Sequence, residues 1–200
     1  MTLFRYNSDL TSGSLQTREC RIIAGLLLQE LDEAAWDKAM YEENVLQKRT
    51  QSTVRRISSA LRKRLEHLSS DFWKALRDGD DELATQVAFF AALAHNLLLV
   101  EFVETVIKDA FITHAEQIAA WQWHDFLDER AQRDPSLLTL SEQTREKMRS
   151  TAFRMLVEVG LLESTRSLVL RPIKVRPELR KLAEQQSLER LINCINVARD

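Results

Sequence analysis

The sequence has few of the residues that build irregular loops or disulfide scaffolds. Its 200 residues include four glycines, three prolines and two cysteines. So few glycines and prolines exclude a collagen-like or low-complexity chain and favour long helices with short connections. Cys20 and Cys194 belong to no CxxC pair, so we expect reduced core thiols. Residues 1–5 lead directly into polar sequence without a secretory signal, which predicts a cytoplasmic protein.

Motifs that carry enzyme chemistry are also missing. The sequence contains no phosphate-binding P-loop, no dinucleotide-binding glycine fingerprint, no nucleophile elbow and no zincin motif. None of its four histidines has a partner at metal-ligand spacing. Asp125, Asp128 and Glu129 lie close together, but an acidic solvated helix face explains them better than a magnesium site. We therefore expect no catalytic residue, no metal and no cofactor, and a protein that is not an enzyme.

The formal net charge of −2 hides a strong asymmetry along the chain. From Val45 to Leu68 there are seven Lys or Arg residues against one Glu. From Arg145 to Lys181 there are ten against four Glu residues. Between these segments, residues 101–134 carry eight acidic and three basic residues. Two basic patches around an acidic middle are typical of a protein that presents chosen faces to a polyanion.

The first basic patch coincides with an amphipathic helix predicted over residues 52–68. Its apolar stripe recurs at helical spacing: Val54, Ile57, Leu61, Leu65 and Leu68. Its basic residues gather on the opposite face, except for Arg64, which lies nearer the apolar edge and could form an internal ion pair. A solvated outer face is the alternative interpretation. It is weakened because acidic partners at i±4 are almost absent.

The second basic patch covers residues 141–176 and combines a helix with a predicted hairpin. Ser141 is a good N-cap, and Gly160 can end the helix in the left-handed conformation. Two short apolar strands, 161–163 and 168–171, follow around a polar turn. This order is typical of the recognition helix and wing of a winged helix-turn-helix. A plain helix-hairpin unit and a protein-binding winged helix remain alternatives.

The uncharged run from Leu83 to Val100 is long enough to consider as a membrane span. Gln86, His95 and Asn96 would be costly in hydrocarbon, and the flanks are acidic rather than basic. We therefore predict a buried central helix, broken near residues 96–101, and no membrane insertion.

Together these patterns predict an all-α fold in two domains. Residues 1–134 form a multi-helix bundle, and residues 135–200 form a winged helix-turn-helix-like unit with one short β-hairpin. The boundary follows a helix expected over residues 116–130, at Asp134-Pro135. Pro177 is expected to start one last helix that runs through Ile195. The expected DNA-binding residues come from both basic patches: Lys48, Arg49, Arg55, Arg56, Arg62, Lys63, Arg145, Lys147, Arg149, Arg154, Arg166, Arg171, Lys174 and Arg176.

Over nearly its full length the chain resembles the BrxA family of BREX phage-exclusion systems. The resemblance rests on Trp36 and four segments: GLLLQEL, VLQKRTQSTVRRISSALRKRL, HNLLLVEFVETVI and RMLVEVGLLES. It implies a cytoplasmic, non-catalytic subunit that binds double-stranded DNA beside other BREX proteins, namely a methyltransferase and ATPases. Members have also been labelled NusB-like RNA-binding proteins, and this label keeps RNA open as a ligand. Others have been labelled inner-membrane proteins, a label that fits the uncharged run from Leu83 to Val100.

A helical protein-protein adaptor is the alternative from a different functional class. In that case the aromatic segment from Trp121 to Phe126 and the acidic middle would dock a partner protein. The basic faces would then be incidental.

Overall fold

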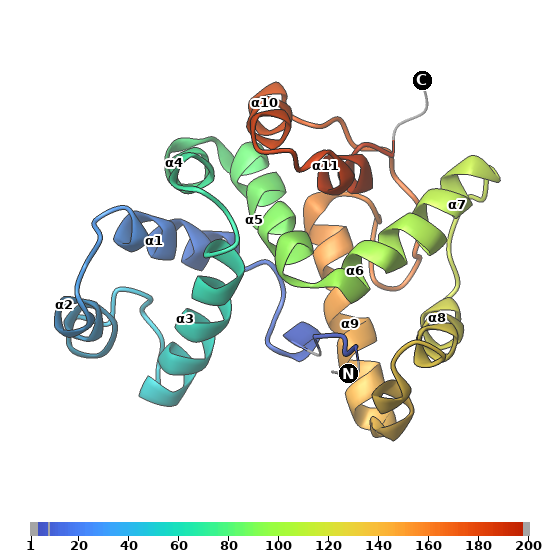
Figure 1. Ribbon diagram of the computed structural model, residues 1–200, viewed down its shortest axis with the longest axis horizontal. Helices are drawn as coiled ribbons and strands as arrows, with labels where there is room; N and C mark the ends of the chain where they lie inside the picture. Colours follow the sequence, from blue (N-terminus) through green and yellow to red (C-terminus); the bar gives the residue numbers. More distant parts are fainter. Residues whose placement is uncertain (1–3, 8, 198–200) are drawn as a thin grey trace. The chain divides into compact units, whose positions relative to one another are not determined.

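Helices make up the regular secondary structure in the computed structural model, which describes residues 4–7 and 9–197 (Figure 1). Across these residues the chain forms α-helices with short 3-10 and π-helical pieces, and it forms no strand. The prediction of an all-α fold is therefore confirmed.

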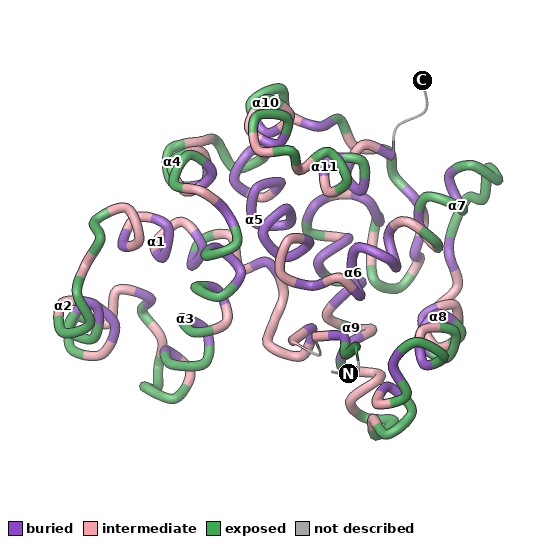
Figure 2. The backbone as a smooth tube through the Cα atoms, in the orientation of Figure 1, coloured by how far each residue is buried: buried purple, intermediate pink, exposed green. Residues whose placement is uncertain are grey.

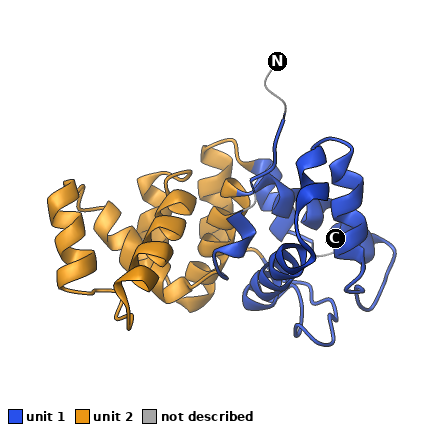
Figure 3. Cartoon of the chain, turned by 90° about the horizontal axis from the view of Figure 1, so that it is seen from below, with its two compact units in different colours: residues 1–14, 96–174, 189–200 blue, residues 15–95, 175–188 orange. Residues whose placement is uncertain are grey.

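The chain divides into two compact units, and each is assembled from segments that are far apart in the sequence (Figure 3). Unit 1 comprises Met1–Ser14, Asn96–Lys174 and Glu189–Asp200, and unit 2 comprises Leu15–His95 and Val175–Leu188. The boundary expected at Asp134-Pro135 lies inside unit 1, where Asp134 caps the short helix that follows. The expected division into a helical bundle of residues 1–134 and a winged-helix-like domain of residues 135–200 stays a prediction.

Unit 2 is built around α5, which is buried along most of its length (Figure 2). It contacts α1, α3, α4 and α10, and the rings of Phe72 on α4 and Phe90 on α5 stack with centroids 5.2 Å apart. The helices of this unit are α1 (Thr17–Leu27), α2 (Glu33–Asp37), η2 (Lys38–Glu42), α3 (Gln51–Leu65), α4 (Ser70–Asp78), α5 (Asp81–His95) and α10 (Pro177–Gln185).

Unit 1 is built around a cluster of aromatic rings. Phe102 lies at its centre, with ring centroids 4.8 Å from Trp123, 5.3 Å from Phe126 and 6.0 Å from Phe153. The elements of this unit are η1 (Asp9–Thr11), α6 (Leu97–Phe102), η3 (Val103–Ile107), α7 (Lys108–Ile112), α8 (Gln122–Ala131), η4 (Pro135–Thr139), α9 (Glu142–Val159) and α11 (Glu189–Ile195).

The uncharged central run is broken at the position that its sequence indicated. Helix α5 ends at His95, and the Asn96 side chain accepts a hydrogen bond from the backbone N–H of Leu99, which caps α6. Over the described part of the chain, no single helix has both the length and the apolar composition to cross a bilayer. Among the residues that the structure describes, the helical stretches Asp81–His95 and Leu97–Ile112 meet that criterion when they are taken together.

The predicted β-hairpin is present only as isolated pairing. Leu162 forms an antiparallel bridge with Leu170, and Val169 forms another with Gln117. Leu168, directly before the bridged residues Val169 and Leu170, adopts a left-handed backbone with φ of 52°, which ends the extended conformation there. No strand therefore develops in residues 161–171, and the wing is not confirmed.

Three expected helices differ in extent from the structure. The helix expected to run to Leu68 ends at Leu65 in α3. The helix expected from residue 116 begins at Gln122 in α8, because Gln117 is bridged to Val169. The last helix is split into α10 and α11, and Ser187 between them has a left-handed φ of 55°. Pro177 does occupy the start of α10, as predicted.

Both cysteines are buried, and neither forms a disulfide in the part of the chain described. Burial raises the pKa of the Cys194 thiol to about 12. This thiol therefore stays protonated and unreactive, as expected for a core residue.

Candidate nucleic-acid interface

Helix α3 places a row of cations on its outward face. Thr50 caps the helix by accepting a hydrogen bond from the Thr53 backbone N–H at 3.2 Å. The predicted apolar stripe is buried on the other side of the helix. The exposed basic residues are Arg49, just before the helix, and Arg55, Arg56, Arg62 and Lys63 within it. The sequence therefore predicted correctly which face of this helix is basic and exposed.

The guanidinium groups of two of these cations, Arg55 and Arg62, stack on aromatic rings. The Arg55 guanidinium lies 5.5 Å from the centroid of the Tyr41 ring. The Arg62 guanidinium lies 4.5 Å from the centroid of the ring of Trp36, which is buried. Arg62 also pairs with Glu66 at 2.7 Å, one helical turn away. Guanidinium groups resting on aromatic faces keep their charge while losing conformational freedom. These two side chains are therefore partly ordered before any ligand binds.

Two basic residues of the first patch have internal roles. Lys48 forms an ion pair with Glu19 at 2.7 Å. Burial alone would raise the pKa of the Glu19 carboxyl, but Lys48 and Arg18 outweigh it and hold the pKa below its ordinary value. Arg64 is 4% exposed, which agrees with its predicted place at the apolar edge. Lys48 therefore contributes less free charge to this face than the sequence indicated.

The α9 helix confirms its predicted caps. Ser141 accepts a hydrogen bond from the Thr144 backbone N–H, and Gly160 ends the helix with φ of 93°. Its apolar residues recur at helical spacing and are buried: Met148, Ala152, Met155, Leu156 and Val159.

The cations at the start of α9 are neutralised within unit 1. Arg145 is only 16% exposed and forms an ion pair with Asp128 of α8. Arg149 pairs with Glu146 at 2.6 Å, and Glu146 also contacts His124 at 2.7 Å. Hydrogen bonds from Arg149 and His124 lower the pKa of the Glu146 carboxyl despite its desolvation. Neither arginine presents a free guanidinium.

The remaining cations of the second patch are divided between the two units. Arg171 pairs with Glu163 in unit 1. Arg176 belongs to unit 2, where it pairs with Glu178 at 2.9 Å and with Asp80 at 2.7 Å. These contacts raise the pKa of Arg176 above its ordinary value.

The second patch nevertheless retains exposed cations, all of them in unit 1. Lys147 and Arg154 are seven residues apart on the exposed side of α9, and Arg166 lies in the turn between the bridged segments. Lys174 is also exposed, near the end of this part of unit 1.

The structure brings together one polar cluster that sequence spacing did not indicate. Side-chain ligand atoms of His124, Glu142 and Glu146 lie within 4.8 Å of one another. Spacing missed the cluster because His124 and Glu146 are 22 residues apart. The Arg149 guanidinium already supplies positive charge to Glu146, so we assign no metal to this cluster.

Comparison with known proteins identifies the family. The family model described as BrxA matches residues 4–187. The chain belongs to the BrxA family. A protein named BREX protein BrxA from Paramagnetospirillum magneticum is 34% identical over 97% of this chain and 98% of its own length. Another of that name from Escherichia coli is 27% identical over 94% of this chain and 88% of its own length.

The fold of this BrxA-family chain also matches a solved structure. A crystal structure described as an uncharacterized protein from Magnetospirillum magneticum superimposes with a TM-score of 0.89 at 33% identity. The match covers 98% of this chain and all of that chain. Both relatives are named as BREX proteins. Both basic helices, α3 and α9, lie within the residues that the family model matches.

Proposed function

We propose that this protein is a non-catalytic component of a BREX system that binds duplex DNA, with the outward face of α3 as its main phosphate contact. The observation that carries the proposal is the exposed row of α3 cations, two of them ordered on aromatic rings. Most of a protein's affinity for DNA comes from such contacts with phosphates.

The spacing of the row fits a phosphate backbone. Arg55 and Arg62 are seven residues apart, as are Arg56 and Lys63. With a rise of about 1.5 Å per residue, each pair spans roughly 10 Å along the helix. One DNA strand presents a phosphate about every 3.4 Å along the duplex axis, so each pair can contact phosphates about three steps apart. Two such pairs side by side can follow one strand.

A second contact through α9 is part of the proposal. Lys147 and Arg154 repeat the seven-residue spacing, and Arg166 follows in the turn after the helix. The bridge between Leu162 and Leu170 supports a wing-like role for this turn. Arg145 and Arg149 are less available because reaching a base edge would break their ion pairs. We therefore assign α9 to phosphate binding rather than to base reading.

A salt titration of binding to a generic duplex tests the proposal. If five to eight phosphates are engaged, log K should fall with log[salt] at a slope of about −4 to −7. A slope near zero, or no binding at low salt, would refute the proposal and favour the adaptor alternative. Tighter binding to an RNA duplex of the same sequence would favour RNA as the ligand.

A pair of double variants locates the contact. Arg55→Gln/Lys63→Gln removes one cation from each of the two pairs, Arg55/Arg62 and Arg56/Lys63, and leaves the buried stripe intact. The slope should become shallower by about two units, and affinity should fall. Lys74→Gln/Lys181→Gln is the matched control, since it removes two exposed cations of unit 2 that lie outside α3. Equal losses in both variants would indicate nonspecific charge effects and exclude α3 as the contact.

A further inference from the structure

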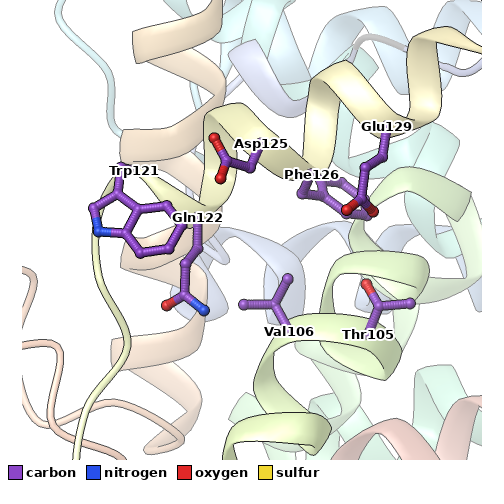
Figure 4. Close-up of a pocket in the computed structure, with 7 residues that line it drawn as sticks. All are labelled: Thr105, Val106, Trp121, Gln122, Asp125, Phe126 and Glu129. Atoms are coloured by element: carbon purple, nitrogen blue, oxygen red, sulfur yellow. The ribbon is translucent and has the colours of Figure 1, made fainter.

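A small pocket opens between η3 and α8 in unit 1 (Figure 4). Its volume is about 190 Å³, which is below the range of roughly 300–1,000 Å³ typical of sites for whole small-molecule ligands. The pocket therefore suits one inserted side chain rather than a cofactor. The lining residues are Thr105, Val106, Trp121, Gln122, Asp125, Phe126 and Glu129.

The rim of this pocket combines an exposed indole with two carboxylates. Trp121 is 61% exposed, although its neighbours Trp123 and Phe126 are buried in the aromatic core. Asp125 and Glu129 follow Trp121 at spacings of four and eight residues, which places all three on one side of α8. Figure 4 shows their side chains around the same opening, with Val106 and Thr105 on the opposite wall.

The rim carries negative charge that the rest of unit 1 neutralises only in part. Neighbouring acids are committed elsewhere: Glu101 pairs with Arg130 and Arg133, and Glu104 pairs with Arg190. For Asp125 the described residues provide no ion pair. Glu129 forms a long ion pair with Arg130, at 3.7 Å. The same guanidinium approaches Glu101 more closely, at 2.7 Å, and lies 4.8 Å from the centroid of the Phe126 ring, so it shares its charge among several groups. Surplus negative charge beside an exposed ring favours a cationic ligand.

We propose that this pocket receives an arginine side chain from a basic segment of a partner protein. The guanidinium would stack on the Trp121 indole and donate hydrogen bonds to Asp125 and Glu129. Arginine fits better than lysine because its planar group can stack and pair with carboxylates at once. The acidic rim repels nucleic acid, so this surface is separate from the cationic faces proposed to bind DNA.

Nuclear magnetic resonance of the tryptophan indole N–H groups tests the proposal on the full-length protein. The probe is the peptide acetyl-Gly-Arg-Gly-amide, with the glutamine peptide acetyl-Gly-Gln-Gly-amide as its control. The Trp121 signal is assigned by its loss in Trp121→Phe. We expect the arginine peptide to shift the Trp121 signal in a saturable manner. A response of equal size to the glutamine peptide would overturn the proposal.

Two further variants separate recognition at the pocket from general attraction to an acidic surface. Asp125→Asn/Glu129→Gln should weaken arginine-peptide binding by about five- to tenfold, since it removes both hydrogen-bonding charges. Asp109→Asn/Glu116→Gln removes the same charge from exposed positions of unit 1 outside the pocket and should change binding less than about twofold. Equal losses would refute the site. The salt slope of duplex binding should be the same in both variants, so failure here is distinguishable from failure of the proposed DNA-binding function.

Discussion

Replacing Glu101 with glutamine should destabilise unit 1 far more than the same change at Glu104, one turn further along. Glu101 is 8% exposed and accepts hydrogen bonds from the Tyr6 hydroxyl at 2.8 Å and from Arg133 at 2.9 Å. Arg130 approaches the same carboxylate at 2.7 Å, as an ion pair rather than a well-aligned hydrogen bond. One carboxylate thus holds the N-terminal segment, α6 and the end of α8 together.

The expected size of the effect follows from the exposure of each partner. The Arg133 side chain is 55% exposed, so its pair with Glu101 should contribute no more than about 1 kcal/mol. The contacts of Glu101 with Arg130 and with the Tyr6 hydroxyl are better shielded from water, because Arg130 is only 20% exposed and Tyr6 is buried. A shielded hydrogen bond to a charged group contributes about 1.5–3 kcal/mol to stability. Glutamine keeps one acceptor but turns an N–H donor toward the guanidinium groups. We therefore expect a loss of about 2–4 kcal/mol in the free energy of unfolding.

Glu104→Gln is the matched control. Its partner Arg190 is 57% exposed, so losing this pair should cost less than about 1 kcal/mol. Urea and thermal unfolding of both variants, followed by circular dichroism, measure the difference. For a chain of this size the Glu101→Gln change should lower the Tm by about 5–15 °C.

A second readout tests the cause of that effect. Burial, the hydrogen bond to Glu101 and the charge of Glu101 raise the pKa of the Tyr6 hydroxyl. In Glu101→Gln this pKa should fall toward its ordinary value, which an ultraviolet titration of the two tyrosines would show. If Glu101→Gln unfolds like Glu104→Gln and the Tyr6 pKa is unchanged, the Glu101 network contributes nothing and the reasoning is wrong.

Two further predictions concern local geometry and acid stability. Gly160→Ala should destabilise the protein by about 1–2 kcal/mol, because alanine is strained at φ of 93° and its Cβ would lie 3.2 Å from Ile173 Cγ2; an unchanged urea midpoint would contradict this. Burial alone would raise the pKa of the Asp134 carboxyl, but hydrogen bonds from Ser136 and Tyr6 outweigh it and hold the pKa below its ordinary value of 3.8. Because the pKa is lower in the folded state, the stabilisation is present above that ordinary value and is lost as pH falls through the folded-state pKa. Melting curves between neutral and acid pH should therefore show a smaller acid-induced loss in Asp134→Asn than in the unchanged protein.

The sequence predicted those features that residues within one helical turn determine. The buried stripe of α3 follows from its period, and the ends of α9 follow from Ser141 and Gly160. Asn96 both interrupts the central run and caps the next helix, so its short polar side chain explains the break. In each case the cause is local, and the structure agrees with the expectation.

The sequence could not show which charges neutralise one another. Arg145 was expected among the DNA-binding residues, but its side chain pairs with Asp128, which is 17 residues earlier. Arg176 and Asp80 are 96 residues apart. Such pairs depend on tertiary packing, so a count of basic residues overestimates the free charge of the second patch. The α3 cations have fewer acidic neighbours, and their exposure was easier to anticipate.

Two irregularities of the backbone could not be predicted from the sequence pattern either. The apolar period continues across the break between α10 and α11, so period alone predicted one helix. Ser187 and Leu168 adopt left-handed conformations, although serine and leucine seldom do so. Their residue types therefore do not predict these conformations. Both the split helix and the missing strands follow from these two positions.

The interleaving of the two units has a consequence for how the chain is made. Unit 2 lacks α10 until residues 175–188 have been synthesised, and unit 1 lacks α11 until residues 189–195 have followed. A nascent chain that has reached only Asp134 thus exposes apolar surface of both units on the ribosome. Neither unit can finish folding as an independent early domain, in contrast to the usual order in which N-terminal domains fold first. Completion of the fold is thereby tied to the synthesis of residues 175–195, and a ribosome that stalls before them releases a substrate for chaperones or proteases rather than half of a working protein.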